Sequence, residues 1–178
     1  MICGDVVGLR AIEHEDLTSF LEWRNKPDLR KNFREYKELS FSNQESWFNN
    51  IVLNSPNHIM FSIVDLENNE LIGACGLNYI DWVNRNADLS IYIGIDDLYI
   101  DEKFAPDATK ILLDYGFNEL NLHRIYVEIY DIDVKKQKLL EDLNFTFDGC
   151  LRETHWTEGK WCNSLFYSIL ENEYSLRK

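Results

Sequence analysis

The first third of the chain changes from strand-like to helix-like hydrophobic spacing. Residues 6–12 are mostly apolar and predict a short strand. Over 13–25 the apolar residues recur every three or four positions, which predicts a helix. Ser42 and Glu45 have the spacing of a capping box, so a second helix is expected over 42–53. The chain is therefore expected to begin with one strand and two helices.

Three apolar stretches follow at 58–66, 70–80 and 87–94, separated by short polar segments. Links this short join neighbouring strands that run in opposite directions. The pattern therefore predicts an antiparallel meander that forms most of the sheet.

The last third alternates between the two kinds of spacing. Residues 105–120 have helical spacing, and Pro106 suits a first helical turn. A strand is expected over 123–131, where apolar and polar residues alternate, and a short helix over 134–145. Two further strands are expected on either side of a turn at 157–160.

Length and composition fit a single domain over residues 1–178. The chain has 178 residues and is 45% hydrophobic, which is enough for one well-packed core. The order of elements predicts an α+β fold, with a mixed sheet of about seven strands and helices on both faces. We expect no second domain.

The charge of the chain limits its partners. Lysine and arginine total 18 against 31 acidic residues, a net charge of −13. Because nucleic acid and anionic membranes repel such a chain, neither is expected as a partner, and a cationic substrate is favoured.

The four cysteines have no CxxC pair and the four histidines no metal spacing, so neither a metal nor a disulfide framework is expected. The N-terminus has no basic segment followed by an apolar run, and no stretch approaches about 20 apolar residues. We therefore expect a cytoplasmic protein with reduced thiols.

Four segments carry a resemblance to a known family: "VGLRAIEHEDLTSFLEWRNKPDLR" (7–30), "LIGACGLNYIDWVNRNADLSIYIG" (71–94), "LLDYGFNELNLHRIYVEIYD" (112–131) and "LRETHWTEGKWCNSLFYSIL" (151–170). In this order they resemble the GCN5-related N-acetyltransferases (GNAT), in the branch of the ribosomal-protein N-terminal, spermidine and nucleotide-sugar acetyltransferases. The resemblance implies a mostly antiparallel, twisted sheet that splays between its fourth and fifth strands, here 87–94 and 123–131. It also implies acetyl-CoA as co-substrate, with its pantetheine arm in that splay.

The resemblance implies where the cofactor would lie. Backbone groups near Ile91 and Ile93 would pair with the pantetheine arm, and the loop before residue 108 would meet the pyrophosphate at a helix N-terminus. The full set of implied cofactor-binding residues is Ile91, Tyr92, Ile93, Lys103, Phe104, Ala105, Asp107, Ala108, Asp133 and Lys138.

The pyrophosphate loop departs from the family pattern Gln/Arg-x-x-Gly-x-Gly/Ala. Its positions fall on Ile100, Lys103 and Ala105, of which only Ala105 conforms. Asp101, Glu102 and Asp107 also add negative charge near the expected pyrophosphate. Lys103 is either a substitute phosphate ligand or an ordinary exposed lysine.

Other departures fall on the fourth helix of the family. The position of an asparagine after the fifth strand holds Asp133, and Asn144 replaces a glycine. Leu140 stands where the family often has a tyrosine that protonates the leaving thiolate. Leucine has no proton to donate, so water or another group would supply it.

The resemblance also suggests candidates for catalysis and acceptor binding. Asp88 and Glu128, on the two splayed strands, and His155, in the last hairpin, are candidate bases for the amine proton. For each, a paired or solvated structural role is the alternative. Candidate acceptor-binding residues are Arg30, Arg34, Tyr36, Trp82 and Tyr130, whereas His123 is expected to be structural.

The expected function is acetyl transfer from acetyl-CoA to a primary amine of an amino sugar, a polyamine or a peptide N-terminus, by direct attack. The alternative is a GNAT-fold domain that has lost acyl-CoA chemistry and acts as a binding or regulatory module. A homodimer is possible, because dimers are frequent in the family.

Overall fold

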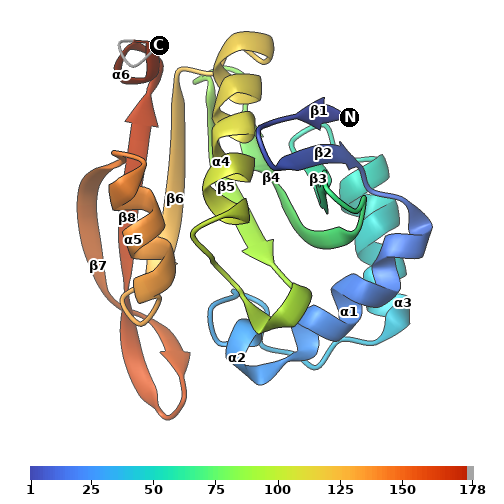
Figure 1. Cartoon of the computed structure of the whole chain (residues 1–178). Helices are drawn as coiled ribbons and strands as arrows, with labels where there is room; N and C mark the ends of the chain where they lie inside the picture. Colours follow the sequence, from blue (N-terminus) through green and yellow to red (C-terminus); the bar gives the residue numbers. More distant parts are fainter. Residues whose placement is uncertain (176–178) are drawn as a thin grey trace.

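The computed structural model describes residues 1–175 and is built around one sheet (Figure 1). Its strands lie in the order β1-β2-β3-β4-β5-β6-β8-β7. All neighbouring pairs are antiparallel except β5 and β6, which are parallel. The strands are β1 (Ile2–Cys3), β2 (Val7–Ala11), β3 (Ile59–Asp65), β4 (Leu71–Asp81), β5 (Asn86–Ile93), β6 (Arg124–Tyr130), β7 (Thr146–Thr157) and β8 (Lys160–Leu170).

Seven of these strands were expected from the sequence, and the two-residue β1 is the addition. The α+β class and the mostly antiparallel sheet are confirmed. The pattern could not predict β1 because two residues have no measurable periodicity.

The sheet splays between β5 and β6, as expected. These strands pair only where Asn86, Ala87 and Asp88 face Arg124, Ile125 and Tyr126. Beyond Asp88 no pairing continues. Figure 1 shows the ribbons of β5 and β6 diverging toward their lower ends. Two backbone edges therefore face each other across an opening that contains no strand.

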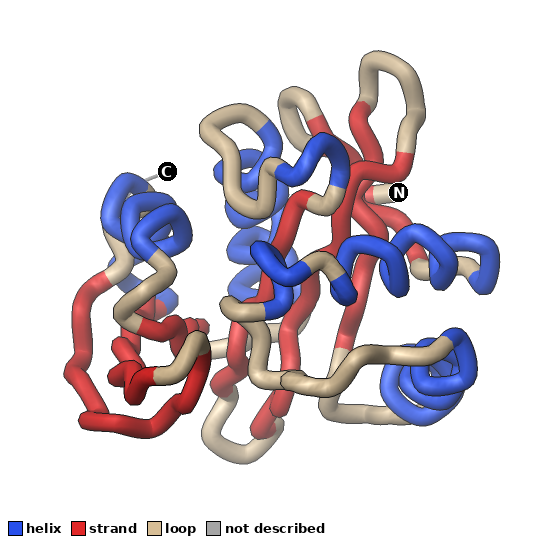
Figure 2. The backbone as a smooth tube through the Cα atoms, turned by 90° about the horizontal axis from the view of Figure 1, so that it is seen from below, coloured by secondary structure: helices blue, strands red, loops and turns tan. Residues whose placement is uncertain are grey.

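Helices cover both faces of the sheet (Figure 2). Gly116, which follows α4, lies against Leu77 and Ile125 on one face. Trp23 of α1 packs against Tyr92 of β5 on the other face, with ring centroids 6.4 Å apart. The helical segments are η1 (His14–Asp16), α1 (Leu17–Asn25), α2 (Pro27–Arg30), α3 (Phe41–Trp47), η2 (Phe48–Leu53), η3 (Ile95–Asp97), α4 (Phe104–Asp114), η4 (Tyr115–Glu119), α5 (Val134–Asp142) and α6 (Glu171–Ser175).

The start of α3 differs from the expectation. Its capping box joins Ser40 and Asn43, each side chain accepting the other's backbone N–H, so the predicted box of Ser42 and Glu45 is wrong. Ser40 has the extended backbone that an N-cap needs, whereas Ser42 is already inside the helix. Both serines have a polar residue three positions later, so spacing alone could not choose between them.

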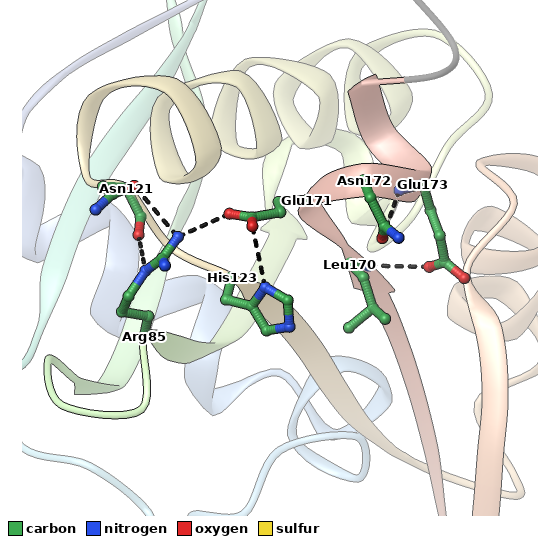
Figure 3. A network of polar contacts seen from close by, with 7 residues as sticks. All are labelled: Arg85, Asn121, His123, Leu170, Glu171, Asn172 and Glu173. Atoms are coloured by element: carbon green, nitrogen blue, oxygen red, sulfur yellow. Dashed lines mark hydrogen bonds and ion pairs between the residues drawn. The ribbon is translucent and has the colours of Figure 1, made fainter.

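A polar network holds the closed end of the splay (Figure 3). Glu171 pairs with Arg85 at 2.7 Å and with His123 at 3.2 Å. Arg85 also donates to the backbone carbonyl of Asn121 at 2.6 Å. His123 therefore has the structural surroundings expected of it, next to the three residue pairs that join β5 to β6.

No helix within residues 1–175 is both long and apolar enough to cross a membrane.

Candidate active site

A groove of about 490 Å³ lies on the face of the sheet that α1 covers. It is lined by the loop over residues 32–37 and by both strands of the splay. Asp88, Ser90, Glu128 and Tyr130 face it from β5 and β6. Two of the three candidate bases, Asp88 and Glu128, are thus brought into one cavity.

Arg34 joins these two carboxylates. Its Nη2 donates to Asp88 Oδ2 and to Glu128 Oε2, each at 2.8 Å. The other oxygen of Glu128 accepts from the Ser164 hydroxyl at 2.6 Å. Arg34 was expected to contact the acceptor, but here its guanidinium is directed at the sheet.

The surroundings of Asp88 adjust its basicity. Only 4% of Asp88 is exposed, and this burial raises the pKa of its carboxyl above the ordinary value, although Arg34 acts in the opposite direction. Burial alone would lower the pKa of Arg34, but the two carboxylates outweigh it and raise that pKa. Asp88 is therefore a carboxylate with more than ordinary proton affinity, held next to a permanent cation.

Lys136 adds a buried cation to the groove. It lies in the first turn of α5, where Asp133 caps the helix by accepting the Lys136 backbone N–H at 3.1 Å. Its Nζ lies 5.2 Å from the centre of the Tyr99 ring. Burial lowers the pKa of Lys136, although Asp133 and Asp88 act against this effect.

The remaining candidates occupy varied positions. His155 stacks on Tyr130 with centroids 3.7 Å apart, and burial lowers its pKa. Tyr36 lines the groove and is 78% exposed. Arg30 pairs with Glu38, and Trp82 donates to the carbonyl of Pro56. Neither Arg30 nor Trp82 lines the groove.

A second cavity of about 480 Å³ lies between α4 and α5. Ile100, Asp101, Lys135 and Lys138 are among the residues that line it. Because Lys136 faces the groove, α5 presents cations to both cavities.

The Asp101 carboxylate occupies the free backbone groups at the start of α4. It accepts the N–H groups of Lys103, Phe104 and Ala105 at 3.0, 2.9 and 2.9 Å. These are donors of the kind that bind an anion at a helix N-terminus. Sequence reasoning noted only the charge of Asp101, although an aspartate before a helix is also a typical capping signal.

Other loop residues serve the fold. Asp107 accepts the backbone N–H groups of Asp5, Val6 and Val7, so its carboxylate anchors the link before β2. Lys103 Nζ lies 4.4 Å from the centre of the Phe104 ring. The buried residues Ala105, Ala108 and Tyr92 belong to the core, and Lys138 pairs with Asp142 at 2.7 Å.

Tyr99 spans the open end of the splay, which sequence reasoning did not anticipate. Its backbone N–H and carbonyl bond to those of Ile93, at 2.8 and 2.7 Å. Its hydroxyl donates to Asp133 across the gap. The segment before α4 therefore bridges β5 and α5, and a positive φ of 59° at Tyr99 accompanies this path.

Comparison with known proteins identifies the family of this fold. A sequence model of the Acetyltransferase (GNAT) domain matches residues 7–146. The chain belongs to the GNAT acetyltransferase family. The resemblance seen in the sequence is thereby confirmed.

Individual relatives of this GNAT protein agree. An uncharacterized N-acetyltransferase p20 of Bacillus licheniformis is 30% identical, over 94% of each chain. Spermidine N(1)-acetyltransferase of Vibrio cholerae is 28% identical, over 93% of this chain and 94% of the relative. A crystal structure of Vibrio cholerae spermidine N-acetyltransferase with CoA and spermine has a TM-score of 0.87 at 27% identity, covering 95% of this chain and 98% of that one.

The GNAT family implies acyl-CoA, and the splay fits its pantetheine arm. Ile93 directs its backbone groups away from β4, toward Tyr99. Because these directions alternate along a strand, Ile91 and Leu89 face the same side, where β6 no longer pairs. The expected Ile91 contact is therefore available, whereas the backbone of Ile93 already has Tyr99 as its partner.

The pyrophosphate end fits less directly. The three N–H groups at the start of α4 already have a carboxylate ligand in Asp101. Lys135 and Lys138 line the cavity next to them, although Lys138 is already paired there with Asp142. A bound pyrophosphate would thus use these lysines and would have to displace Asp101 to reach the amides.

Proposed function

We propose that this GNAT protein transfers an acetyl group from acetyl-CoA to a primary amine held in the groove. The main support is that Asp88 and Glu128 converge on Arg34 where the splay begins, in the groove an amine would enter. The spermidine acetyltransferases among its relatives indicate that the fold supports this class of reaction.

Asp88 is proposed as the base. An ammonium group must lose a proton before its nitrogen can attack, and a buried carboxylate with a raised pKa accepts that proton more readily than an ordinary aspartate. Arg34 keeps the carboxylate in place and limits the rise in its pKa. Glu128 shares the same cation and is the second candidate. His155 is the weakest, since its ring stacks on Tyr130 outside the groove lining.

Lys136 is proposed as the proton donor that Leu140 cannot be. Acetyl-CoA, when bound, supplies the acetyl group as a thioester, and its sulfur needs a proton on release. Lys136 lies one helical turn before Leu140, and therefore on the same side of α5. Its lowered pKa makes its ammonium group a stronger acid than an exposed lysine.

A non-catalytic binding module is the second candidate function. Asp101 and Tyr99 support it, since both occupy backbone groups that a family member would offer to the cofactor. This candidate predicts no CoA binding at all.

Calorimetric titration with CoA, followed by thiol release with acetyl-CoA and a panel of primary amines, separates the two functions. The enzyme should bind CoA and release thiol with at least one amine, and Lys136→Met should lower kcat while leaving the CoA Kd unchanged. A folded sample that binds no CoA and releases no thiol would exclude acetyl transfer.

The self-association of this chain and its cytoplasmic location remain predictions. A related Vibrio cholerae spermidine N-acetyltransferase structure is described as dodecameric, at 27% identity and a TM-score of 0.80, over 97% of this chain and 98% of that one. We propose that this chain also self-associates, as a homodimer at least. Light scattering during size-exclusion chromatography would detect it.

A further inference from the structure

A recess of about 390 Å³ adjoins the groove between α1, α3 and the loop that carries Arg34. Arg24, Lys37 and Trp47 line both cavities, so the two adjoin. A molecule whose amine lies beside Asp88 could extend into this recess.

Two cations at the recess lack carboxylate partners. Within residues 1–175, neither Arg24 nor Lys37 has a carboxylate within 4.0 Å of its charged nitrogens. The Arg24 guanidinium lies 5.0 Å from the Phe33 ring centre, and Lys37 Nζ lies 6.0 Å from that of Tyr36.

Neighbouring cations in the sequence behave differently. Lys26 pairs with Asp97, Arg30 with Glu38 and Lys31 with Asp28. In an acidic chain most cations in this region have thus found carboxylates. Within residues 1–175, Arg24 and Lys37 at the recess have not.

A buried donor at the recess also lacks a partner. Gln44 is only 3% exposed and lines the recess, and its side-chain Nε2 has no hydrogen-bond partner within the described chain. Buried polar groups are nearly always hydrogen-bonded, so an unpaired amide on a residue that lines the same recess as Arg24 and Lys37 indicates an absent acceptor of hydrogen bonds.

The charge of the combined cavity contrasts with that of the chain. Groove and recess together are lined by Arg24, Arg34, Lys37 and Lys136 against Glu35, Asp88 and Glu128. Four cations thus face three acids here, whereas the whole chain has 18 against 31. Arg34 already pairs with two of the acids, and Glu35 accepts the backbone N–H of Lys37 at 3.0 Å.

We infer that the recess binds an anionic group, a carboxylate or a phosphate, on the same molecule whose amine is acetylated. Arg24 and Lys37 pair with its oxygens, and Gln44 donates a hydrogen bond to it. This inference rests on the proposed function and narrows the acceptor to an amine that carries an acid. A polyamine such as spermidine offers nothing to these donors.

Matched acceptors test this inference. Lysine and lysinamide differ only in the carboxylate, and glucosamine 6-phosphate and glucosamine only in the phosphate. With acetyl-CoA, we expect kcat/KM to be about 10-fold higher for the anionic member of at least one pair, and for that member to exceed spermidine. The pair that responds distinguishes a carboxylate from a phosphate.

Variants locate the effect. Arg24→Gln and Lys37→Ala should each raise KM for the preferred anionic amine by about 10-fold, with little change in kcat and none in KM for its neutral partner. Gln44→Met should do the same to a smaller extent. Lys110→Ala removes an exposed cation from the outer face of α4 and should change neither value.

An NMR titration with inorganic phosphate, in the absence of acetyl-CoA, tests binding at the recess independently of turnover. We expect saturable shifts at Arg24 and Gln44 that Lys37→Ala weakens. Thiol release that prefers neutral amines or spermidine overturns the inference but leaves acetyl transfer intact. If no amine is acetylated, the proposed function fails, and phosphate binding that Lys37→Ala weakens then supports an anion site in the recess alone. Absence of phosphate binding overturns that site as well.

Discussion

The two sides of the splayed sheet differ in how far the chain has used its own polar groups. On the cofactor side, Asp101 occupies the N–H groups at the start of α4, and Tyr99 pairs with Ile93. On the acceptor side, within residues 1–175, Arg24 and Lys37 have no carboxylate partner and the Gln44 amide nitrogen has no hydrogen-bond partner. A cofactor must therefore displace internal contacts to reach the α4 amides or the Ile93 backbone, whereas an acceptor meets donors that are already free.

This difference indicates where each ligand gains its binding energy. Exchanging an internal hydrogen bond for one to a ligand changes the free energy little, whereas satisfying an unpaired buried donor gains the full interaction. The acceptor side should thus determine specificity, and the cofactor side should bind CoA more weakly than the free helix N-terminus would.

The largest effect on catalysis is expected at Asp88, the proposed base on the acceptor side. Asp88→Asn should lower kcat for thiol release by about 100-fold or more, because the amide cannot accept the amine proton. The CoA Kd should change little, since the pantetheine arm is expected to pair with the backbone of β5 rather than with the Asp88 side chain. Calorimetry and thiol release measure the two values.

The pH profile sharpens this test. For the natural protein, kcat/KM should rise with pH through a pKa above about 3.9, the ordinary aspartate value, because burial raises that of Asp88. Glu67→Gln makes the same chemical change in a distant turn and should leave the profile intact. A full rate in Asp88→Asn would assign the base elsewhere, with Glu128 next to be tested.

Removal of Arg34 should have the next largest effect, this time on stability. Arg34→Met leaves Asp88 buried without its cation and should lower the free energy of unfolding by about 1–2 kcal/mol at pH 7, less than for a fully buried pair because the Arg34 side chain is 44% exposed. Urea unfolding measures this loss.

The loss at Arg34 should depend on pH with a defined sign. Without Arg34 the pKa of Asp88 rises further, so the folded state binds a proton more tightly than the unfolded state. Stability therefore falls as pH increases from about 4 toward that raised pKa, and the loss shrinks again in acid. Arg30→Met removes an exposed pair as a control. A loss independent of pH would mean that Asp88 is not the group affected.

A smaller effect is expected at Asp101, where the cofactor side is occupied by the chain itself. Asp101→Asn keeps a capping oxygen but removes the charge that competes with the pyrophosphate, so the CoA Kd should fall by about 5- to 10-fold. Glu67→Gln controls for the change in net charge. Weaker CoA binding in Asp101→Asn would mean that Asp101 assists the cofactor.

The smallest effect is expected at the closed end of the splay. Glu171→Gln weakens the pairs with Arg85 and His123, which are half exposed, and should lower stability by only about 0.5 kcal/mol. Thermal unfolding would measure this change. Neither the CoA Kd nor thiol release should respond, and a response would show that the closed end controls the opening of the splay.

Much of the fold could be predicted from the sequence, because the apolar residues on the buried face of a helix or strand recur at a fixed spacing. The strand expected at 87–94 is β5, the helix expected at 134–145 contains α5, and the turn at 157–160 joins β7 to β8. Caps were less predictable. Ser40 rather than Ser42 begins α3, since the choice depends on backbone angles that the spacing does not specify.

The candidate site was predicted by its residues but not by their partners. Asp88, Glu128 and Arg34 were each named as candidates. Their hydrogen bonds, however, join Arg34 to residues 54 and 94 positions away in the sequence. Gln44 and Arg24 gave no signal, because an unpaired donor becomes visible only when its neighbours are placed.

The sequence by itself determined the order of elements, the GNAT family and the acidic character of the chain, since these depend on local spacing and composition. Only the tertiary structure decided that Asp101 binds its own helix, that Arg34 turns inward and that the Gln44 amide nitrogen has no hydrogen-bond partner within residues 1–175. Pairing between charges depends on which distant groups converge in a poorly solvated space, and that convergence is a property of the folded chain alone.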